Sequence, residues 1–159
     1  MRKLLCSLMF AVAAIAGNAQ TTYNVRMGLG GVRDFYHDYA EICAIFIEAF
    51  QANIPVNTNK TLTVSPTLSY AWSGDCGSFL SVPVHLGYKI GLGHKSILFP
   101  KVGPLLAYEC DAKEILCGFS TELAWEYKHF VIATNYFYIK ESPVNVDSSG
   151  FHLTFGYKF

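Results

Sequence analysis

The last nine residues of the chain, Phe151 to Phe159, alternate without a break between large apolar side chains and small or polar ones. The odd positions carry Phe, Leu, Phe, Tyr and Phe, while the even positions carry His, Thr, Gly and Lys. Successive side chains of a β-strand point to opposite faces of a sheet. The segment is therefore predicted to be a strand with one aromatic face and one small or polar face.

The rest of the chain after residue 20 divides into similar short runs, separated by clusters of turn-forming residues. The run before Ile54 loses its alternation near Glu48, where we expect a β-bulge, and the faces of the run that ends at Tyr138 cannot be assigned. Many short strands at regular spacing are typical of an all-β barrel or sandwich. We predict an all-β fold, an eight-stranded antiparallel barrel with up-and-down connections. Its strands are expected at residues 22–31, 42–54, 61–73, 78–91, 96–109, 115–127, 130–138 and 151–159.

The first twenty residues have the parts of a secretory signal peptide. Arg2 and Lys3 form a short basic start, residues 4–17 are nearly all apolar, and Gly17-Asn18-Ala19 supplies small residues for cleavage. The apolar run is shorter than the ~20 residues that a membrane-spanning helix needs. We predict a signal peptide at residues 1–19, a barrel domain at residues 20–159, and export from the cytoplasm.

The composition indicates that something other than charge covers part of the surface. Charged residues make up 15% of the chain and aromatic residues another 15%, whereas a soluble domain usually has about a quarter charged residues. The natural covering is lipid. There is no basic excess, with 12 Lys and Arg against 12 Asp and Glu, so nucleic acid is not an expected partner.

The content of the two strand faces indicates which of them meets lipid. The polar faces carry mainly Ser, Thr, Gly and His, which suit the crowded interior of an eight-stranded barrel. The apolar faces carry Tyr and Trp toward the strand ends, as in the aromatic girdles of membrane interfaces. We predict an outward apolar face, against the alternative of a soluble, lipocalin-like ligand-binding barrel with its apolar face inside. The expected interface aromatics are Tyr70, Trp72, Tyr88, Tyr108, Trp125 and Tyr127.

The connections between the runs alternate in character along the chain, so that they divide between the two ends of the predicted barrel. Compact turns at residues 53–60, 93–95 and 127–129 are expected to face the periplasm. The segments at 32–41, 73–77, 110–114 and 140–149 fall at the other end and are expected to face outward. An even number of strands with short periplasmic turns is typical of bacterial outer-membrane barrels. The last strand is then predicted to close the barrel against the first.

Four segments resemble a known family: Ser65–Tyr70, Phe79–Tyr88, Lys101–Tyr108 and Gly156–Phe159. With these strand patterns the chain is similar to the PorT-like outer-membrane β-barrel family, whose barrels are akin to the small OmpA type. The resemblance implies a location in the bacterial outer membrane. It also implies that Phe159 matches the terminal aromatic residue read by the outer-membrane assembly machinery. Some relatives serve a protein secretion system, a role that is not carried over to this chain.

Several charged residues are predicted to point into the barrel. A buried charge is costly unless it is paired, so an internal ion-pair network that fills the barrel is the favoured interpretation. A gated polar path or a small-ligand site is the alternative. No arrangement of residues identifies a nucleophile with its base, so we expect no enzyme activity and no cofactor. The predicted interior charges are Arg26, His85, Lys89, Lys101, Glu122 and Glu126, with Glu48 as a further candidate.

Four cysteines lie after the predicted signal peptide, and all four are expected at the outward ends of strands or in outer loops. Disulfides are permitted in an exported chain. We hypothesise the pairs Cys110–Cys117 and Cys43–Cys76, with four unpaired thiols as the alternative. Their spacing matches no zinc motif.

The first outer loop collects Asp34, His37, Asp38 and Glu41. A metal site is conceivable there, but a solvated acidic loop is the favoured interpretation.

The sequence thus predicts an outer-membrane protein with a side-chain-filled interior and a structural or binding role through its outer loops. The expected partners are outer-membrane lipid, the assembly machinery and an envelope protein. A narrow, porin-like channel is the first alternative.

Overall fold

The computed structural model describes residues 21–34, 39–73, 77–110, 113–140 and 147–159. The predicted signal peptide lies outside these residues. The described part of the chain contains no helix of the length and apolar character needed to cross a membrane.

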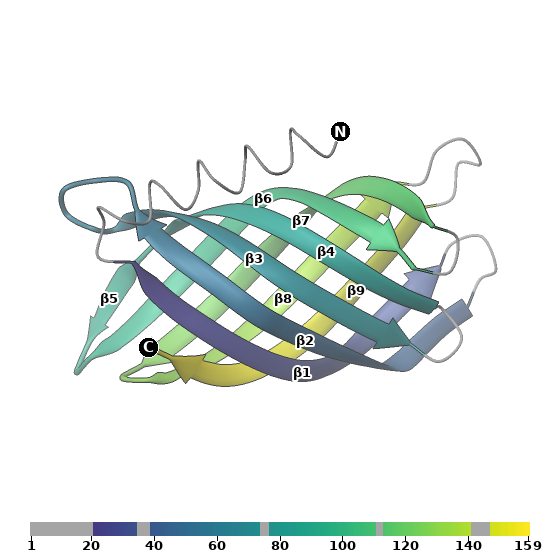
Figure 1. The fold of residues 1–159 in the computed structure, drawn as a ribbon. Helices are drawn as coiled ribbons and strands as arrows, with labels where there is room; N and C mark the ends of the chain where they lie inside the picture. Colours follow the sequence, from purple (N-terminus) through teal and green to yellow (C-terminus); the bar gives the residue numbers. More distant parts are fainter. Residues whose placement is uncertain (1–20, 35–38, 74–76, 111–112, 141–146) are drawn as a thin grey trace.

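The described chain is built from antiparallel strands wound into one elongated barrel (Figure 1). β4 and β5 are separated only by Lys89 and both pair with β6, so together they count as one strand of the barrel. The last strand pairs with the first, and β4 pairs with β6, which closes the sheet. The eight-stranded antiparallel barrel is therefore confirmed. The strands are β1 Thr22–Asp34, β2 Tyr39–Pro55, β3 Leu62–Ser73, β4 Gly77–Tyr88, β5 Ile90–Gly93, β6 Ser96–Glu109, β7 Glu114–Tyr127, β8 Phe130–Lys140 and β9 Asp147–Lys158.

The connections divide between the two ends of the barrel as the sequence predicts. The turns at residues 56–61, 94–95 and 128–129 lie together at the end where the C-terminus lies, called the turn end below (Figure 1). The other four connections join strands at the opposite end, called the loop end. The turn end includes His94 and Lys95, which both have positive φ, as the two central residues of a tight hairpin turn require.

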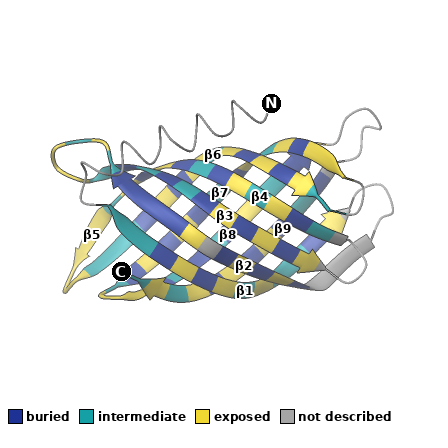
Figure 2. Ribbon diagram, in the orientation of Figure 1, coloured by how far each residue is buried: buried dark blue, intermediate teal, exposed yellow. Residues whose placement is uncertain are grey.

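Buried and exposed residues alternate along nearly every strand, which gives the wall a chequered pattern (Figure 2). The exposed positions are overwhelmingly apolar, whereas many buried positions are polar. A water-soluble barrel would have the opposite arrangement, because burial of apolar surface drives folding in water. The lipocalin-like alternative is therefore not supported. The most exposed apolar residues of this outer face include Met27, Leu29, Val102, Ile115, Phe151, Leu153 and Phe155, each more than half exposed.

A bulge interrupts β2 near its middle, as its sequence pattern predicts. The register of β2 shifts against β3 between Glu48 and Phe50. The same segment shifts against β1 between Asn24 and Arg26. As a result Glu48 and Gln51 both face inward, at 3% and 0% exposure. A regular strand would put two residues at this odd spacing on opposite faces. The bulge thus brings two polar side chains from one strand into the interior.

Inward-facing glycines set how closely neighbouring strands approach. A Cβ atom on Gly28 would collide with the backbone of Leu153 in β9, and one on Gly103 would collide with the backbone of Val84 in β4. Backbone atoms of a closed wall cannot rotate out of the way as a side chain can. These positions therefore require glycine for space.

The substitution Gly28→Ala is expected to destabilise the barrel by about 1–3 kcal/mol, the usual cost of overpacking. The matched control is Gly91→Ala, because a Cβ atom there meets nothing within 4 Å. Urea unfolding of both variants in lipid vesicles measures the difference. Equal stability of the two variants would contradict the tight backbone approach.

Candidate functional site: the barrel interior

The interior has three layers along the barrel axis. Apolar side chains fill the loop end, and we call this the loop-end cluster. Polar and charged side chains fill the middle, and a smaller apolar group, the turn-end cluster, lies beyond them. The turn-end cluster consists of Phe99, Ala124, Val131, Ala133 and the partly buried Ile97. The loop-end cluster consists of Val32, Ala44, Phe46, Ala71, Phe79, Leu105, Ala107, Leu116 and Ile139, with Phe137 against it.

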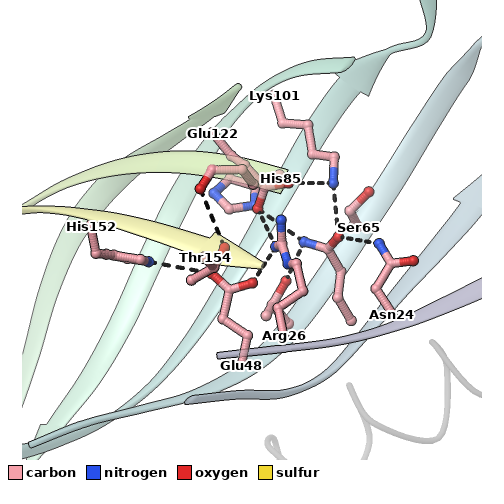
Figure 3. A network of polar contacts seen from close by, with 12 residues as sticks. Asn24, Arg26, Glu48, Ser65, His85, Lys101, Glu122, His152 and Thr154 are labelled. Atoms are coloured by element: carbon pink, nitrogen blue, oxygen red, sulfur yellow. Dashed lines mark hydrogen bonds and ion pairs between the residues drawn. The ribbon is translucent and has the colours of Figure 1, made fainter. Parts of the chain in front are cut away.

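The central network is organised around the carboxylate of Glu122 on β7. Arg26 Nη2 on β1 donates to Glu122 Oε2 at 2.6 Å, and Lys101 Nζ on β6 donates to Oε1 at 2.5 Å. Gln51 Nε2 on β2 adds a third hydrogen bond, to Oε2 at 3.1 Å. Three strands therefore send donors to one acceptor group, and the contacts cross the lumen between β1 and β7 (Figure 3).

A second carboxylate, that of Glu48 on β2, completes the network. Glu48 forms an ion pair with Arg26, and His152 Nε2 on β9 lies 3.3 Å from Glu48 Oε1. Figure 3 shows His152 approaching Glu48 from the opposite side to Arg26. Arg26 therefore bridges two carboxylates that belong to distant strands.

Amide and hydroxyl side chains surround the charged groups. Gln51 accepts from Lys101 Nζ at 2.8 Å and from Asn24 Nδ2 at 3.1 Å, and it donates to Thr67 Oγ1 at 2.9 Å. His85 Nε2 lies 2.7 Å from Ser120 Oγ beside this network. Gln51, Asn24 and Thr67 were not among the predicted site residues. Gln51 could not be predicted from simple alternation, because the bulge in β2 changes the face on which it lies. Asn24 and Thr67 lie on faces that the alternation predicts to be polar.

The network is electrically balanced. Two cations, Arg26 and Lys101, face two anions, Glu48 and Glu122, and each of the four side chains is at most 4% exposed. Breaking such a buried pair is costly, because it leaves an uncompensated charge away from water. The arrangement fills and cross-links the middle of the barrel.

Two of the predicted interior charges lie outside the central network. Glu126 is buried near the turn end, where Lys158 Nζ donates to its Oε2 at 2.6 Å. Lys89 is half-buried, and its Nζ lies 5.3 Å from the centre of the Phe99 ring. The six predicted interior charges therefore divide between the middle of the barrel and its turn end.

The six predicted interface aromatics lie on the outer surface. Trp72 and Tyr88 are about half exposed, and Trp125 donates through Nε1 to Ser96 Oγ at 2.7 Å. Tyr127 stacks on Trp125, with ring centres 6.0 Å apart. Three of the six, Tyr70, Trp72 and Tyr108, belong to the loop-end halves of their strands, and Tyr88, Trp125 and Tyr127 belong to the turn-end halves.

The turn end also carries aromatic residues beyond those predicted. The rings of Phe130 and Phe159 each pack edge to face against Tyr157, and His129 stacks on the same tyrosine ring. Phe159 itself is 69% exposed, and its backbone N–H donates to the carbonyl of Tyr23 at 2.8 Å.

The predicted disulfide between Cys110 and Cys117 is wrong, because both are free cysteines. The register of β6 and β7 places Cys117 opposite Leu106, four residues along β6 from Cys110. Four strand residues span roughly 13 Å, whereas disulfides join Cα atoms less than about 7 Å apart. The second pair, Cys43 and Cys76, involves side chains outside the described residues.

The acidic first loop cannot be placed, since the side chains of Asp34, His37, Asp38 and Glu41 also lie outside the described residues. Elsewhere, within the part of the chain that the structure describes, no group of three or more His, Cys, Asp or Glu side chains could hold a metal ion.

A closed antiparallel barrel of eight strands, apolar outside and polar inside, has the fold of the small transmembrane β-barrels. Two solved structures of bacterial surface proteins share it. Neisserial surface protein A is 11% identical, with a TM-score of 0.61, and the match covers 87% of this chain and 97% of that one. Ail, the attachment invasion locus protein of Yersinia pestis, solved with the heparin analogue sucrose octasulfate, is 14% identical, with a TM-score of 0.52 and coverage of 87% and 99%. At these identities the likeness shows the fold. No protein-family model and no curated protein matches the chain.

Proposed function

We propose that the protein is a bacterial outer-membrane barrel whose interior is closed by side chains and whose structural or binding role is carried by its loop end. The observation that carries this proposal is the central network around Glu122, which crosses the lumen at mid-height. The apolar outer face and the strand lengths support the location. A tilted membrane-spanning strand needs about 9–11 residues, and β6 and β7 have 14 each.

The closed interior favours a structural or binding role over transport. Eight strands enclose a lumen just wide enough for side chains to fill, and here Arg26, Lys101, Glu122 and Gln51 occupy it with their hydrogen-bonding groups turned on one another. Contact with a partner would then involve the loop end, where four connections join the strands. The proposal includes an envelope protein as that partner.

The proposal also includes the finer points taken from the sequence. Delivery would depend on a cleaved signal peptide at residues 1–19 and on the outer-membrane assembly machinery, for which Phe159 remains the predicted recognition residue. Membership of the PorT-like group remains a prediction from strand patterns. The protein is proposed to act without enzymatic chemistry, and the paired charges that fill the lumen support this proposal.

The purified protein is expected to require detergent, to migrate differently on gels before and after heating, and to pass no steady current across planar bilayers. The expectation follows from an apolar outer face and a lumen filled by paired charges. A steady single-channel conductance in the wild type would favour the narrow-channel alternative. Purification of a monomer from water without detergent would overturn the membrane location.

A further inference from the structure

Charged residues are distributed unevenly along the barrel axis. In the sequence, the four connections at the loop end and the residues that flank them contain nine Asp and Glu against three Lys and Arg. The turn end has the opposite balance, with five lysines against one acidic residue, Glu126. The central network between the two ends is neutral, so it does not account for this positive excess. The five lysines are Lys60, Lys89, Lys95, Lys128 and Lys158.

Two of these lysines lie side by side on neighbouring turns. Lys95 belongs to the turn between β5 and β6, and Lys128 belongs to the turn between β7 and β8. The backbone N–H of Lys128 donates to the carbonyl oxygen of Lys95 at 3.4 Å, and both side chains are exposed. Glu126 is already paired with Lys158 at 2.6 Å, so it does not neutralise them. The two turns therefore present adjacent positive charges to an anionic partner.

The outer face of β7 changes from apolar to aromatic to cationic as the strand approaches its turn. Leu123 is exposed on this face, and Trp125 and Tyr127 come next, with their stacked rings 6.0 Å apart between centres. Lys128 follows, and its Nζ lies 5.3 Å from the centre of the Tyr127 ring. Hydrocarbon, the interfacial region and the headgroups follow one another in the same order across half of a bilayer. This order assigns the ammonium group of Lys128 to the level of the headgroups.

Exposed apolar side chains lie next to the same two turns. Ile90 and Leu92 on β5 precede the first turn, and Phe130 on β8 follows the second. A small soluble anion would contact the lysines and leave these apolar groups uncovered. A phospholipid can meet both, because its acyl chains cover apolar side chains while its phosphate contacts lysine. Lysines near a membrane surface attract anionic lipids in particular.

We propose that Lys95 and Lys128 form a binding surface for the headgroups of anionic phospholipids, with Trp125 and Tyr127 beneath them at the membrane boundary. In the proposed topology these lipids belong to the inner leaflet of the outer membrane, which faces the periplasm. The inference rests on the proposed membrane location and adds the class of lipid that the turn end selects.

The test is quenching of tryptophan fluorescence by brominated phospholipids in phosphatidylcholine vesicles. The chain has two tryptophans, so Trp72→Phe leaves Trp125 as the reporter beside the two lysines. Brominated phosphatidylglycerol and brominated phosphatidylcholine are compared at the same mole fraction. The anionic lipid is expected to associate roughly fivefold more strongly with the surface beside Trp125, the effect of about one lysine near a membrane. Trp125→Phe leaves Trp72, in the loop-end half of β3, as the control reporter, for which we expect no preference.

Matched variants show whether the lysines cause the preference. Lys95→Asn and Lys128→Asn together are expected to abolish it. Asparagine suits both positions, because the two lysines have positive φ angles of 65° and 54°. Lys113→Asn is the control, since Lys113 is exposed with a φ of 59° but follows β6 at the loop end. This variant is expected to keep the full preference, and the heat-dependent gel shift verifies the fold of each variant.

Salt tests the same surface without any change to the lysines. Sodium chloride at about 1 M is expected to weaken the preference, because it shortens the range of electrostatic attraction to about 3 Å. A preference that does not respond to salt would overturn the proposal. Selective loss of the preference in sodium phosphate, compared with sodium chloride of the same ionic strength, would indicate a site for free phosphate and would also overturn it.

The failure of this inference can be distinguished from the failure of the proposed function. Equal quenching of Trp125 by both brominated lipids, or a preference that persists in the folded double variant, would overturn the lipid selectivity alone. Both results would still show Trp125 in contact with lipid. Absence of quenching by either lipid would contradict the membrane location itself, together with the inference that rests on it.

Discussion

Glu122→Gln is expected to lower the free energy of unfolding by about 3–5 kcal/mol, the cost of removing one partner from a buried ion pair. The substitution keeps the shape of the side chain but removes its charge. Arg26 and Lys101 both donate to this carboxylate, at 2.6 and 2.5 Å, so the interior would be left with an excess positive charge. Urea unfolding in lipid vesicles measures the loss.

A second substitution distinguishes the charge imbalance from other causes. Adding Lys101→Met to Glu122→Gln leaves Arg26 paired with Glu48 and restores neutrality. The double variant is therefore expected to lose less free energy of unfolding than the two single variants lose together. The coupling between contacting residues is typically about 0.5–3 kcal/mol. Glu114→Gln on the same strand is the control, because Glu114 is exposed and should change stability by less than about 0.5 kcal/mol. Strict additivity of the two interior changes would show that the network is not coupled.

Leu153→Lys is expected to destabilise the barrel in a bilayer by about 2–4 kcal/mol, the cost of a lysine on the lipid face near the midplane. Leu153 is 51% exposed at the middle of β9, beside Leu29 and Thr134 on the neighbouring strands. In a water-soluble barrel the same change at an exposed site would be neutral. Unfolding in vesicles of fixed lipid composition measures the effect. A loss of stability indicates contact with lipid, and no change indicates contact with water.

Val56→Lys is the matched control for this lipid-face substitution. Val56 is 49% exposed but follows the end of β2 at the turn end, where the penalty for lysine falls to about 0–1 kcal/mol. If Leu153→Lys and Val56→Lys cost the same, the outer face of β9 does not contact hydrocarbon.

The strands and their faces could be predicted because period-two alternation is a local property of the chain. The prediction failed to assign faces only where both faces are apolar. In β8, Val131 and Ala133 point into the turn-end cluster, and Ile139 points into the loop-end cluster. Phe130 and Tyr136 face outward on the same strand. A barrel whose interior is apolar at both ends removes the contrast on which such a prediction depends.

The inward direction of the charges was also predictable, but their partners were not. Arg26 and Glu122 are 96 residues apart in sequence and meet across the lumen. Their meeting depends on the register of every strand between them and on the tilt of the strands in the wall. The same register puts Glu126 beside Lys158 at the turn end, away from the central network.

The error over Cys110 and Cys117 has the same origin. Two cysteines on either side of a hairpin turn invite a pairing by proximity in sequence. Antiparallel register instead pairs Cys117 with Leu106, and both thiols stay free. Two residues that are close in sequence on either side of a turn can therefore be far apart in the paired strands.

By itself the sequence determined the architecture, the strand number and the outward direction of the apolar face, because each of these follows from alternation within single strands. The tertiary structure alone decided which charges pair, which thiols stay apart, and which turn lysines lie side by side. Those features depend on the register of strands brought together by closure, when β9 pairs with β1. The closing strand, Phe151 to Phe159 in the sequence pattern, extends in the structure from Asp147 to Lys158 and supplies His152 to the interior.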